Sequence, residues 1–273
     1  MEKINLGKMK TDLVEGQAHY YLGESDQHHI NDYLGQKIHL NSLGEIKCVA
    51  CERKIKKSFQ QGYCFPCFRS LAQCDTCMVR PETCHYSEGT CREPQWGEAH
   101  CFQEHYIYLA NTGALKVGIT RFSNVPHRWM DQGATQALPI LKVKERLHSG
   151  LVEVLFKSHV ADKTNWRTML KGGFDQIDMH ARRDELFSKV ESSLADFKEK
   201  YGADSISLVE DQKVIDIGFP ILENPVKIST HNLDKNPLVE GALMGIRGQY
   251  LILDTGVLNV RKFSGYECEL SIS

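Results

Sequence analysis

The spacing of hydrophobic positions divides the chain into segments with different expected structures. Near the N-terminus, residues 18–22 and 37–40 are short runs rich in apolar and aromatic side chains. Glycines interrupt these runs, at Gly23, Gly35 and Gly44. Short β-prone runs between glycine breaks are typical of strands joined by turns. We therefore predict a small β element over residues 1–46.

The segment that begins at residue 105 has the pattern of an α/β unit. Residues 106–110 and 115–120 are two β-prone runs, and the Asn-Thr-Gly turn between them predicts a β-hairpin. A helix and a third strand are expected next, at residues 126–133 and 139–147. The helix is expected because a proline suits the first turn of a helix and a glycine suits its end.

Two further helices are expected in the same unit. Ser149 is a candidate N-cap, and Val152 and Phe156 recur at helical spacing after it. Glu153 lies one position off this apolar stripe, so we expect its side chain at the helix surface. Residues 176–201 form a longer amphipathic pattern whose charged face is expected to lie in solvent.

The C-terminal part of the chain is again β-prone. The runs 248–253 and 257–261 flank the sequence Asp-Thr-Gly, which predicts a second hairpin. The whole pattern predicts an α+β fold. Its expected parts are a small β element, a cysteine-rich zinc module, an α/β core and a β-rich C-terminal region, at residues 1–46, 47–104, 105–202 and 203–273.

Composition and charge exclude some classes of protein. Of the 273 residues, 41% are hydrophobic and 25% are charged, as in a folded protein of two or three packed units. The net charge is -2, so the chain is no strongly basic nucleic-acid-binding domain, and such binding would depend on local patches. The sequence contains neither a long apolar stretch nor an apolar leader, which predicts a cytoplasmic protein without membrane contact.

The cysteines are concentrated in one part of the chain, since nine of the ten lie between Cys48 and Cys101. In a reducing compartment such a cluster indicates metal binding rather than disulfides. Two Cys-x2-Cys pairs, Cys48 with Cys51 and Cys64 with Cys67, each place two thiolates on one turn. Together they supply the four ligands of a structural zinc site, in which no position is left open for water.

Five more cysteines follow, at Cys74, Cys77, Cys84, Cys91 and Cys101. A tetrahedral site takes four ligands, so one of the five is spare. We predict a second structural zinc ion bound by Cys74, Cys84, Cys91 and Cys101, with Cys77 as the substitute for Cys74. The alternative is a redox-active or unliganded set of thiols.

Four motifs occur in order within residues 105–170. They are Tyr106-Ile107-Tyr108, Lys116-Val117-Gly118, Arg128 in the predicted helix, and Glu153 followed by Asn165. In this order they resemble the GIY-YIG endonuclease superfamily, so the core is expected to be a GIY-YIG-like α/β core. Tyr106 stands where that superfamily usually has glycine, and Lys116 replaces its second signature tyrosine, as in the phage-type branch. The whole chain also resembles a bacterial family of uncharacterised zinc-binding proteins.

The resemblance implies a role for each of four residues in phosphodiester hydrolysis. Tyr108 would act as a base or orient the attacking water, and Arg128 would hold the scissile phosphate. Glu153 would be the single protein ligand of a hydrated Mg²⁺ or Mn²⁺ ion, and Lys116 would add a positive charge. Without the resemblance, such residues are typical of packing and of surface charge.

A basic stretch beside the first zinc ligands is a candidate contact for nucleic acid. Its members are Arg53, Lys54, Lys56 and Lys57, and a solvated face is the alternative interpretation. Three functions follow as hypotheses: a Mg²⁺-dependent nuclease, a non-catalytic nucleic-acid-binding or adaptor protein on a nuclease-like scaffold, and a thiol- or zinc-based redox sensor. We place the nuclease first and expect nucleic acid as the partner.

Overall fold

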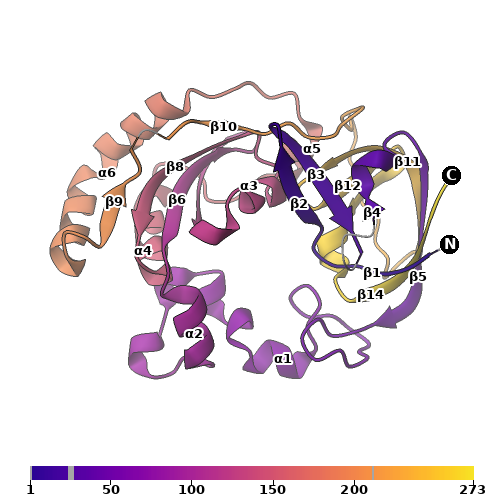
Figure 1. Ribbon diagram of the computed structural model, residues 1–273, viewed down its shortest axis with the longest axis horizontal. Coiled ribbons are helices and arrows are strands. Elements are labelled where there is room, and N and C mark those ends of the chain that lie inside the picture. Colours follow the sequence, from indigo (N-terminus) through magenta and orange to yellow (C-terminus); the bar gives the residue numbers. More distant parts are fainter. Residues whose placement is uncertain (1, 24–27, 211) are drawn as a thin grey trace.

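Strands in the computed structural model, which describes residues 2–23, 28–210 and 212–273, form three antiparallel sheets. Figure 1 shows the long helix α6 (Met179–Tyr201) at one end of the molecule and the sheet that holds both termini at the other. The cysteine-rich segment runs between these ends, with α1 (Phe65–Ser70) and α2 (Pro94–Cys101) on the lower side of the view. The protein is therefore of the mixed α+β class that the sequence predicts.

The largest sheet joins the two ends of the chain. It has six strands in the order β1-β14-β5-β11-β12-β13. Their bounds are β1 Glu2–Asn5, β14 Tyr266–Ile272, β5 Lys37–Ile46, β11 Leu238–Arg247, β12 Tyr250–Leu253 and β13 Gly256–Asn259. Strand β5 pairs with β14 along one edge and with β11 along the other. One sheet thus contains strands from residues 1–46 and from residues 203–273, which the hydrophobic pattern assigns to separate parts. The reason is that C-terminal strands form hydrogen bonds with the backbone of β5 on both sides.

A smaller sheet packs beside this one. It consists of β2 (Lys10–Val14), β3 (Gln17–Leu22) and β4 (His28–His29) in that order. Alternate side chains of β3 are buried, as expected for a strand with one face on a core. These side chains share that core with Trp129 and Met130, which follow the first hairpin of the α/β core in the sequence.

The central sheet is built on the predicted hairpin of β6 (His105–Asn111) and β7 (Leu115–Arg121), which is confirmed. Strand β8 (Gln136–Val143) pairs with the other edge of β6, and it begins and ends earlier than the predicted strand at residues 139–147. Two short strands, β9 (Ile206–Leu208) and β10 (Ile215–Asp216), both pair with β8. The α/β core therefore recruits residues from beyond position 202.

Helices cover both faces of the central sheet. Helix α4 (Arg146–Lys157) and α6 bury their apolar sides in one core with β6, β7 and β8. Helix α3 (His127–Asp131) lies against the opposite face, where the rings of Trp129 and Tyr108 are 6.0 Å apart between centroids. A short helix, α5 (Trp166–Lys171), precedes α6. Among the described residues, none of the helices combines the length and the apolar character needed to cross a bilayer.

The cysteine-rich segment contains little regular structure besides α1 and α2. Its remainder is a series of 3-10 turns, at Ala72–Cys74, Thr76–Met78, Pro81–Thr83 and Tyr86–Glu88. The turn at Pro81–Thr83 packs directly on α4 at Gly150, where no side chain fits between them. A Cβ at Gly150 would lie 2.5 Å from the backbone nitrogen of Glu82 and 2.6 Å from the Cβ of Pro81.

Helix α4 begins one turn before the predicted N-cap, Ser149, so that prediction is wrong. The hydroxyl of Ser149 donates to the carbonyl oxygen of Arg146 at 2.7 Å, inside the helix. Arg146 itself reaches the cysteine-rich segment, where its guanidinium donates to the carbonyl oxygen of Met78 at 2.6 Å. Packing against a distant segment therefore extends the helix beyond the start that local sequence favours.

We expect Gly150→Ala to destabilise the protein by about 2 kcal/mol, the usual cost of forcing an extra methyl into a packed contact. In an unobstructed helix interior the same change would stabilise by roughly 1 kcal/mol. Urea unfolding measures the difference. Gly7→Ala is the matched control, because nothing lies within 4 Å of the added Cβ at Gly7. A Gly150→Ala protein as stable as the control would contradict the close approach of α4 to the 81–83 turn.

Candidate functional site

The first four cysteines form a compact cluster. Cys48 and Cys51 lie on the loop after β5, Cys64 is the N-cap of α1, and Cys67 lies in the first turn of that helix. All four Sγ atoms lie within 4.8 Å of one another, and those of Cys51 and Cys64 are 3.8 Å apart. Zinc–sulfur bonds of about 2.3 Å put the corners of a tetrahedron about 3.8 Å apart. The cluster is therefore geometrically suited to bind zinc.

Hydrogen bonds to sulfur support the thiolate form of this cluster. The backbone N–H of Cys64 donates to the Sγ of Cys48 at 3.2 Å, and that of Cys67 donates to the Sγ of Cys64 at 3.4 Å. The Nε of Arg53 donates to the Sγ of Cys51 at 3.1 Å. Burial raises the pKa of Cys48, but the N–H donors outweigh burial and lower this pKa to about 6. Zinc binds the thiolate, so these donors favour the metal-binding form of Cys48, whereas the neighbouring thiol of Cys64 and burial raise the pKa of Cys67 to about 12.

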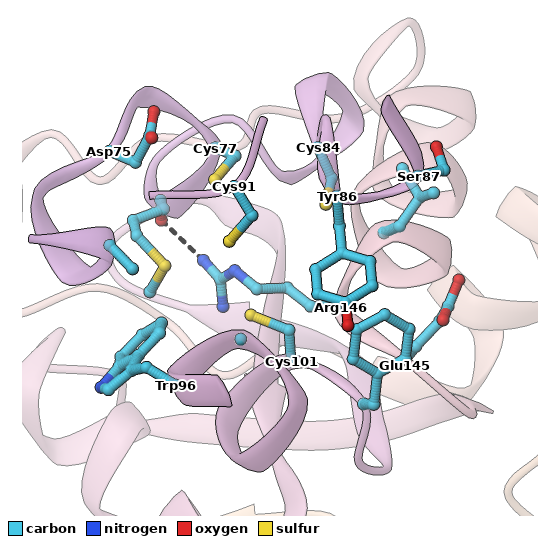
Figure 2. A pocket seen from close by; sticks show the side chains of 15 residues that line it. Asp75, Cys77, Cys84, Tyr86, Ser87, Cys91, Trp96, Cys101, Glu145 and Arg146 are labelled. Atoms are coloured by element: carbon cyan, nitrogen blue, oxygen red, sulfur yellow. Dashed lines mark hydrogen bonds between the residues drawn. The ribbon is translucent and has the colours of Figure 1, made fainter. Parts of the chain in front are cut away.

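Four later cysteines surround a cavity instead of forming a compact cluster. Cys77, Cys84, Cys91 and Cys101 line a cavity of about 280 Å³, and Arg146 extends among them (Figure 2). Among the described residues, these thiols are not drawn together to within 4.8 Å as those of the first cluster are. The second zinc ion therefore stays a prediction.

Cys74 does not line this cavity. It is buried at the end of the 72–74 turn, where its backbone N–H donates to the carbonyl oxygen of Leu71 at 3.1 Å. Of the two ligand sets that the sequence allows, the set with Cys77 surrounds the cavity and the set with Cys74 does not. Cys74 thus lies outside the group of cysteines that surrounds the cavity.

Asp75, Cys77 and His85 also bring their side-chain atoms within 4.8 Å of one another. The carboxylate of Asp75 is already paired, however. It accepts from Arg92 at 2.8 Å and lies 3.4 Å from the Nε2 of His85. A metal ion would have to displace this arginine, so we read the group as an ion pair that braces the segment.

Tyr108 of the first motif and Gly118 of the second lie opposite each other on β6 and β7. Tyr108 is completely buried, and a Cβ at Gly118 would lie 2.6 Å from its hydroxyl oxygen. The tyrosine ring therefore crosses β7 where only glycine leaves room. Its hydroxyl donates to the Oε1 of Gln132 at 2.7 Å. The glycine of the second motif is thus a packing requirement of the tyrosine in the first.

Arg128 and Lys116 lie beside Tyr108. Burial raises the pKa of Tyr108, and the charge of Arg128 on α3 opposes this shift. Lys116 is on the same face of the hairpin and is only 4% exposed. Burial and the charge of Arg128 lower the pKa of Lys116 to about 8, against the opposing effect of Glu153. The charges of Arg128 on α3 and of Glu153 on α4 thus both act on Tyr108 and Lys116 of the hairpin.

Glu153 is 9% exposed, so the prediction that it lies at the helix surface is wrong. Its carboxylate pairs with Lys157 at 3.3 Å, and Lys157 also contacts Asp162 at 3.3 Å. Burial raises the pKa of Glu153, and Lys157 opposes that shift. The side chain is covered because the chain after α4 returns along the open edge of β7, where the N–H of Val117 donates to the carbonyl oxygen of Ala161 at 2.8 Å.

Asn165, the last member of the ordered motifs, has a structural role as the N-cap of α5. Its side-chain oxygen accepts from the N–H groups of Arg167 and Thr168 at 3.2 and 3.3 Å. This contact accounts for an asparagine at a helix start without any role in chemistry.

The predicted nucleic-acid contacts Arg53, Lys54, Lys56 and Lys57 are all exposed, on the loop of the first cysteine cluster. Besides Arg53, which donates to the Sγ of Cys51, two of them have partners at the surface. Lys54 pairs with Glu45 at 2.7 Å, and the ammonium of Lys57 lies 5.5 Å from the centre of the Phe59 ring. The stretch is therefore a solvent-facing basic face attached to the first cysteine cluster.

Sequence reasoning misses Asp162 and Arg261 of the α/β site. Arg261 lies in the 3-10 turn Val260–Phe263 between β13 and β14, and burial lowers its pKa, as does Arg128 to a smaller degree. Two hydrogen bonds connect this turn to α3. The N–H of Val260 donates to the carbonyl oxygen of Gln249, and the side chain of Gln249 donates to the carboxylate of Asp131 at 3.0 Å. No local motif could reveal Arg261, since a different sheet carries it.

Comparison with known proteins places the chain in a family but identifies no characterised relative. The model of one family, described as "Protein of unknown function (DUF2797)", matches residues 35–268. A search of curated proteins and a search of solved structures each find no match.

We expect Lys116→Met to stabilise the protein by about 1 to 3 kcal/mol at pH 7. Methionine is similar in size to lysine, so the change removes a buried charge and keeps the packing. The pKa of Lys116 is near 8 in the folded protein and near 10.5 in the unfolded chain. Between pH 8 and pH 10.5 the unfolded chain therefore binds more protons than the folded protein does. The wild type therefore gains stability as pH rises from 8 to 10.5, and its deficit relative to the variant disappears. Thermal unfolding at pH 7 and 10 measures this, with exposed Lys198→Met as control. A less stable Lys116→Met protein at pH 7 would refute it.

Proposed function

The chain belongs to the DUF2797 family, and we propose that it is a zinc-stabilised protein that acts on nucleic acid as a Mg²⁺- or Mn²⁺-dependent phosphodiester hydrolase of the GIY-YIG type. The observation that carries this proposal is the convergence of Tyr108, Lys116, Arg128 and Glu153 from three elements on one site. Three of these groups, Tyr108, Lys116 and Glu153, are buried and have shifted pKa values, which is more typical of a chemical site than of a core.

The proposed chemistry divides between the groups that handle water and those that hold the phosphate. Tyr108 keeps its proton because burial raises its pKa, so it orients the attacking water rather than deprotonating it. Lys116, with a pKa near 8, can exchange a proton close to neutral pH. Arg128 offers a planar pair of donors to the phosphate oxygens. Because Arg128 lies beside Tyr108 and Lys116, the bound phosphorus would lie next to the attacking water.

Two carboxylates are available for a divalent ion. Glu153 and Asp162 flank the ammonium of Lys157, at 3.3 Å each, and oxygen ligands of this kind suit Mg²⁺. An ion bound there would neutralise charge on the leaving oxygen. Asp162 thus adds a second ligand to the one that the sequence predicts.

Basic groups outside the core support nucleic acid as the substrate. Arg261, on the 3-10 turn before β14, is close enough for the charge of Arg128 to lower its pKa, and the exposed stretch that starts at Arg53 lies on the loop of the first cysteine cluster. Phosphate groups repeat along a nucleic-acid strand, so cations at several places can bind one strand, whereas a small phosphate ester would use only one. The zinc cluster then holds a basic loop in place rather than activating water.

A non-catalytic nucleic-acid-binding protein is the second candidate, and the ion pair between Lys157 and Glu153 favours it. An ammonium 3.3 Å from the carboxylate occupies the position that a metal ion would take. In that function Arg128, Lys116 and Arg261 bind phosphate, and Glu153 only positions the cations around it.

We expect Tyr108→Phe to lower Mg²⁺-dependent cleavage by at least about 100-fold, because it removes the hydroxyl that orients water and keeps the ring. Glu153→Gln, which keeps the shape of a buried side chain, is expected to abolish cleavage. The measurement is cleavage of labelled duplex and single-stranded DNA and RNA with Mg²⁺ or Mn²⁺, at matched zinc content.

Tyr106→Phe, on the same strand, and exposed Glu199→Gln on α6 are the matched controls and should cleave like wild type. Full activity of Glu153→Gln would reject the proposed chemistry. Wild-type protein that binds these nucleic acids and cleaves none of them would establish the binding function instead.

Nucleic-acid affinity should depend on the basic stretch. Replacing Arg53, Lys54, Lys56 and Lys57 by Glu is expected to weaken binding and to make the slope of log affinity against log salt shallower by about 3, since each phosphate contact releases close to one counterion. Fluorescence anisotropy across a salt series measures the slope. Lys198→Glu with Lys200→Glu, exposed on α6, is the control. An unchanged slope in the four-residue variant would show that the stretch is only solvated.

A further inference from the structure

The cavity between the cysteine-rich segment and α4 is larger than a single ion needs. Its volume is about 280 Å³, whereas a water molecule needs only roughly 10 to 15 Å³ of such space. Cys77, Cys84, Cys91 and Cys101 all lie on its wall and come from separate turns and α2 (Figure 2). Four thiols that converge on so large a space are arranged for a ligand larger than one ion.

The first cysteine cluster provides an internal comparison. Its four Sγ atoms lie within 4.8 Å of one another, which fits one tetrahedral ion. The thiols around the cavity come from the same chain, and among the described residues no three of them lie within 4.8 Å of one another. Four cysteines can also hold a [4Fe–4S] cluster, in which each thiolate binds a different iron, so the thiolates stand further apart than around one ion.

A cation is also built into the wall of the cavity. Arg146 extends from the start of α4 among the thiols, and one of its nitrogens donates to the carbonyl oxygen of Met78 at 2.6 Å (Figure 2). Its Nε is buried and has no hydrogen-bond partner among the described residues. A cluster bound by four thiolates carries negative charge, and its sulfurs accept hydrogen bonds. Such a ligand would provide both the counter-charge and the missing acceptor for Arg146.

We propose that Cys77, Cys84, Cys91 and Cys101 bind a [4Fe–4S] cluster in this cavity, in place of a second zinc ion, with Arg146 as the cation beside it. The aromatic rings of Tyr86, Trp96 and Phe102 also line the cavity and shield the cluster from water. Each chain then carries two different metal centres: zinc at the first cluster of cysteines and iron–sulfur at the second.

The position of the cluster connects it with the α/β site. Arg146 and Glu153 both belong to α4, two turns apart, and Gly150 between them contacts the 81–83 turn that precedes Cys84. Loss of the cluster would free this turn and loosen the packing that sets the start of α4. The assignment of the cluster itself does not rest on the proposed function, because it depends only on the cavity, its thiols and Arg146.

The test is the metal and sulfide content of the full chain purified without oxygen from iron-replete cells. We expect one zinc, four irons and four acid-labile sulfides per chain, with the visible absorption of a cluster that bleaches when dithionite reduces it. Protein with two zinc ions and neither iron nor sulfide would overturn the proposal and establish the second zinc ion. Iron without sulfide would also overturn it.

Single substitutions separate the two centres. Cys84→Ser should lose iron and sulfide and keep zinc, whereas Cys48→Ser should lose zinc. Cys74→Ser is the matched control and should keep both, because Cys74 lies outside the cavity lining. Arg146→Gln should keep the cluster with a lower reduction potential, since a positive charge that favours the reduced cluster is gone. Loss of the cluster in Cys74→Ser with retention in Cys84→Ser would overturn the ligand set, even if wild type contains iron.

Discussion

Close packing of α4 against the cysteine-rich segment is the constraint on which the rest of the structure depends. At Gly150 the helix backbone touches the 81–83 turn without an intervening side chain. One turn earlier Arg146 enters the thiol-lined cavity, and one turn later Glu153 reaches the α/β site. The apolar side of the same helix, with Val152 and Phe156, fills the core of the central sheet. One helix thus fixes the positions of the cavity, the core and the site relative to one another.

The two cysteine groups satisfy different physical requirements. The first is local: two Cys-x2-Cys turns, each with N–H groups aimed at sulfur, assemble a tetrahedron from residues 48–67. The second depends on tertiary structure, because its thiols converge only when the 76–78 turn, α2 and α4 are packed together. A single ion can organise the first without help, whereas the second needs a folded wall around its ligand.

Buried charge is concentrated at the α/β site. Lys116 and Glu153 are almost fully covered, and burial shifts the pKa of each toward its neutral form. A core selected only for stability would avoid both charges, since desolvation costs more than such pairs usually return. Beside Tyr108 and Arg128 these two charges lower the stability of the fold but form a polar site from which water is excluded.

The sequence by itself determined the features that depend on near neighbours. The knuckles around Cys48 and Cys64, the hairpins at 106–120 and 248–261 and the helix around Arg128 are set by spacing, turn residues and local hydrogen bonds. Tertiary structure alone decided that β5 lies between C-terminal strands, that Cys77 and not Cys74 faces the cavity, and that Glu153 is buried. Each of these depends on contacts between residues far apart in the chain, and hydrophobic periodicity carries no information about which distant segment covers a given face.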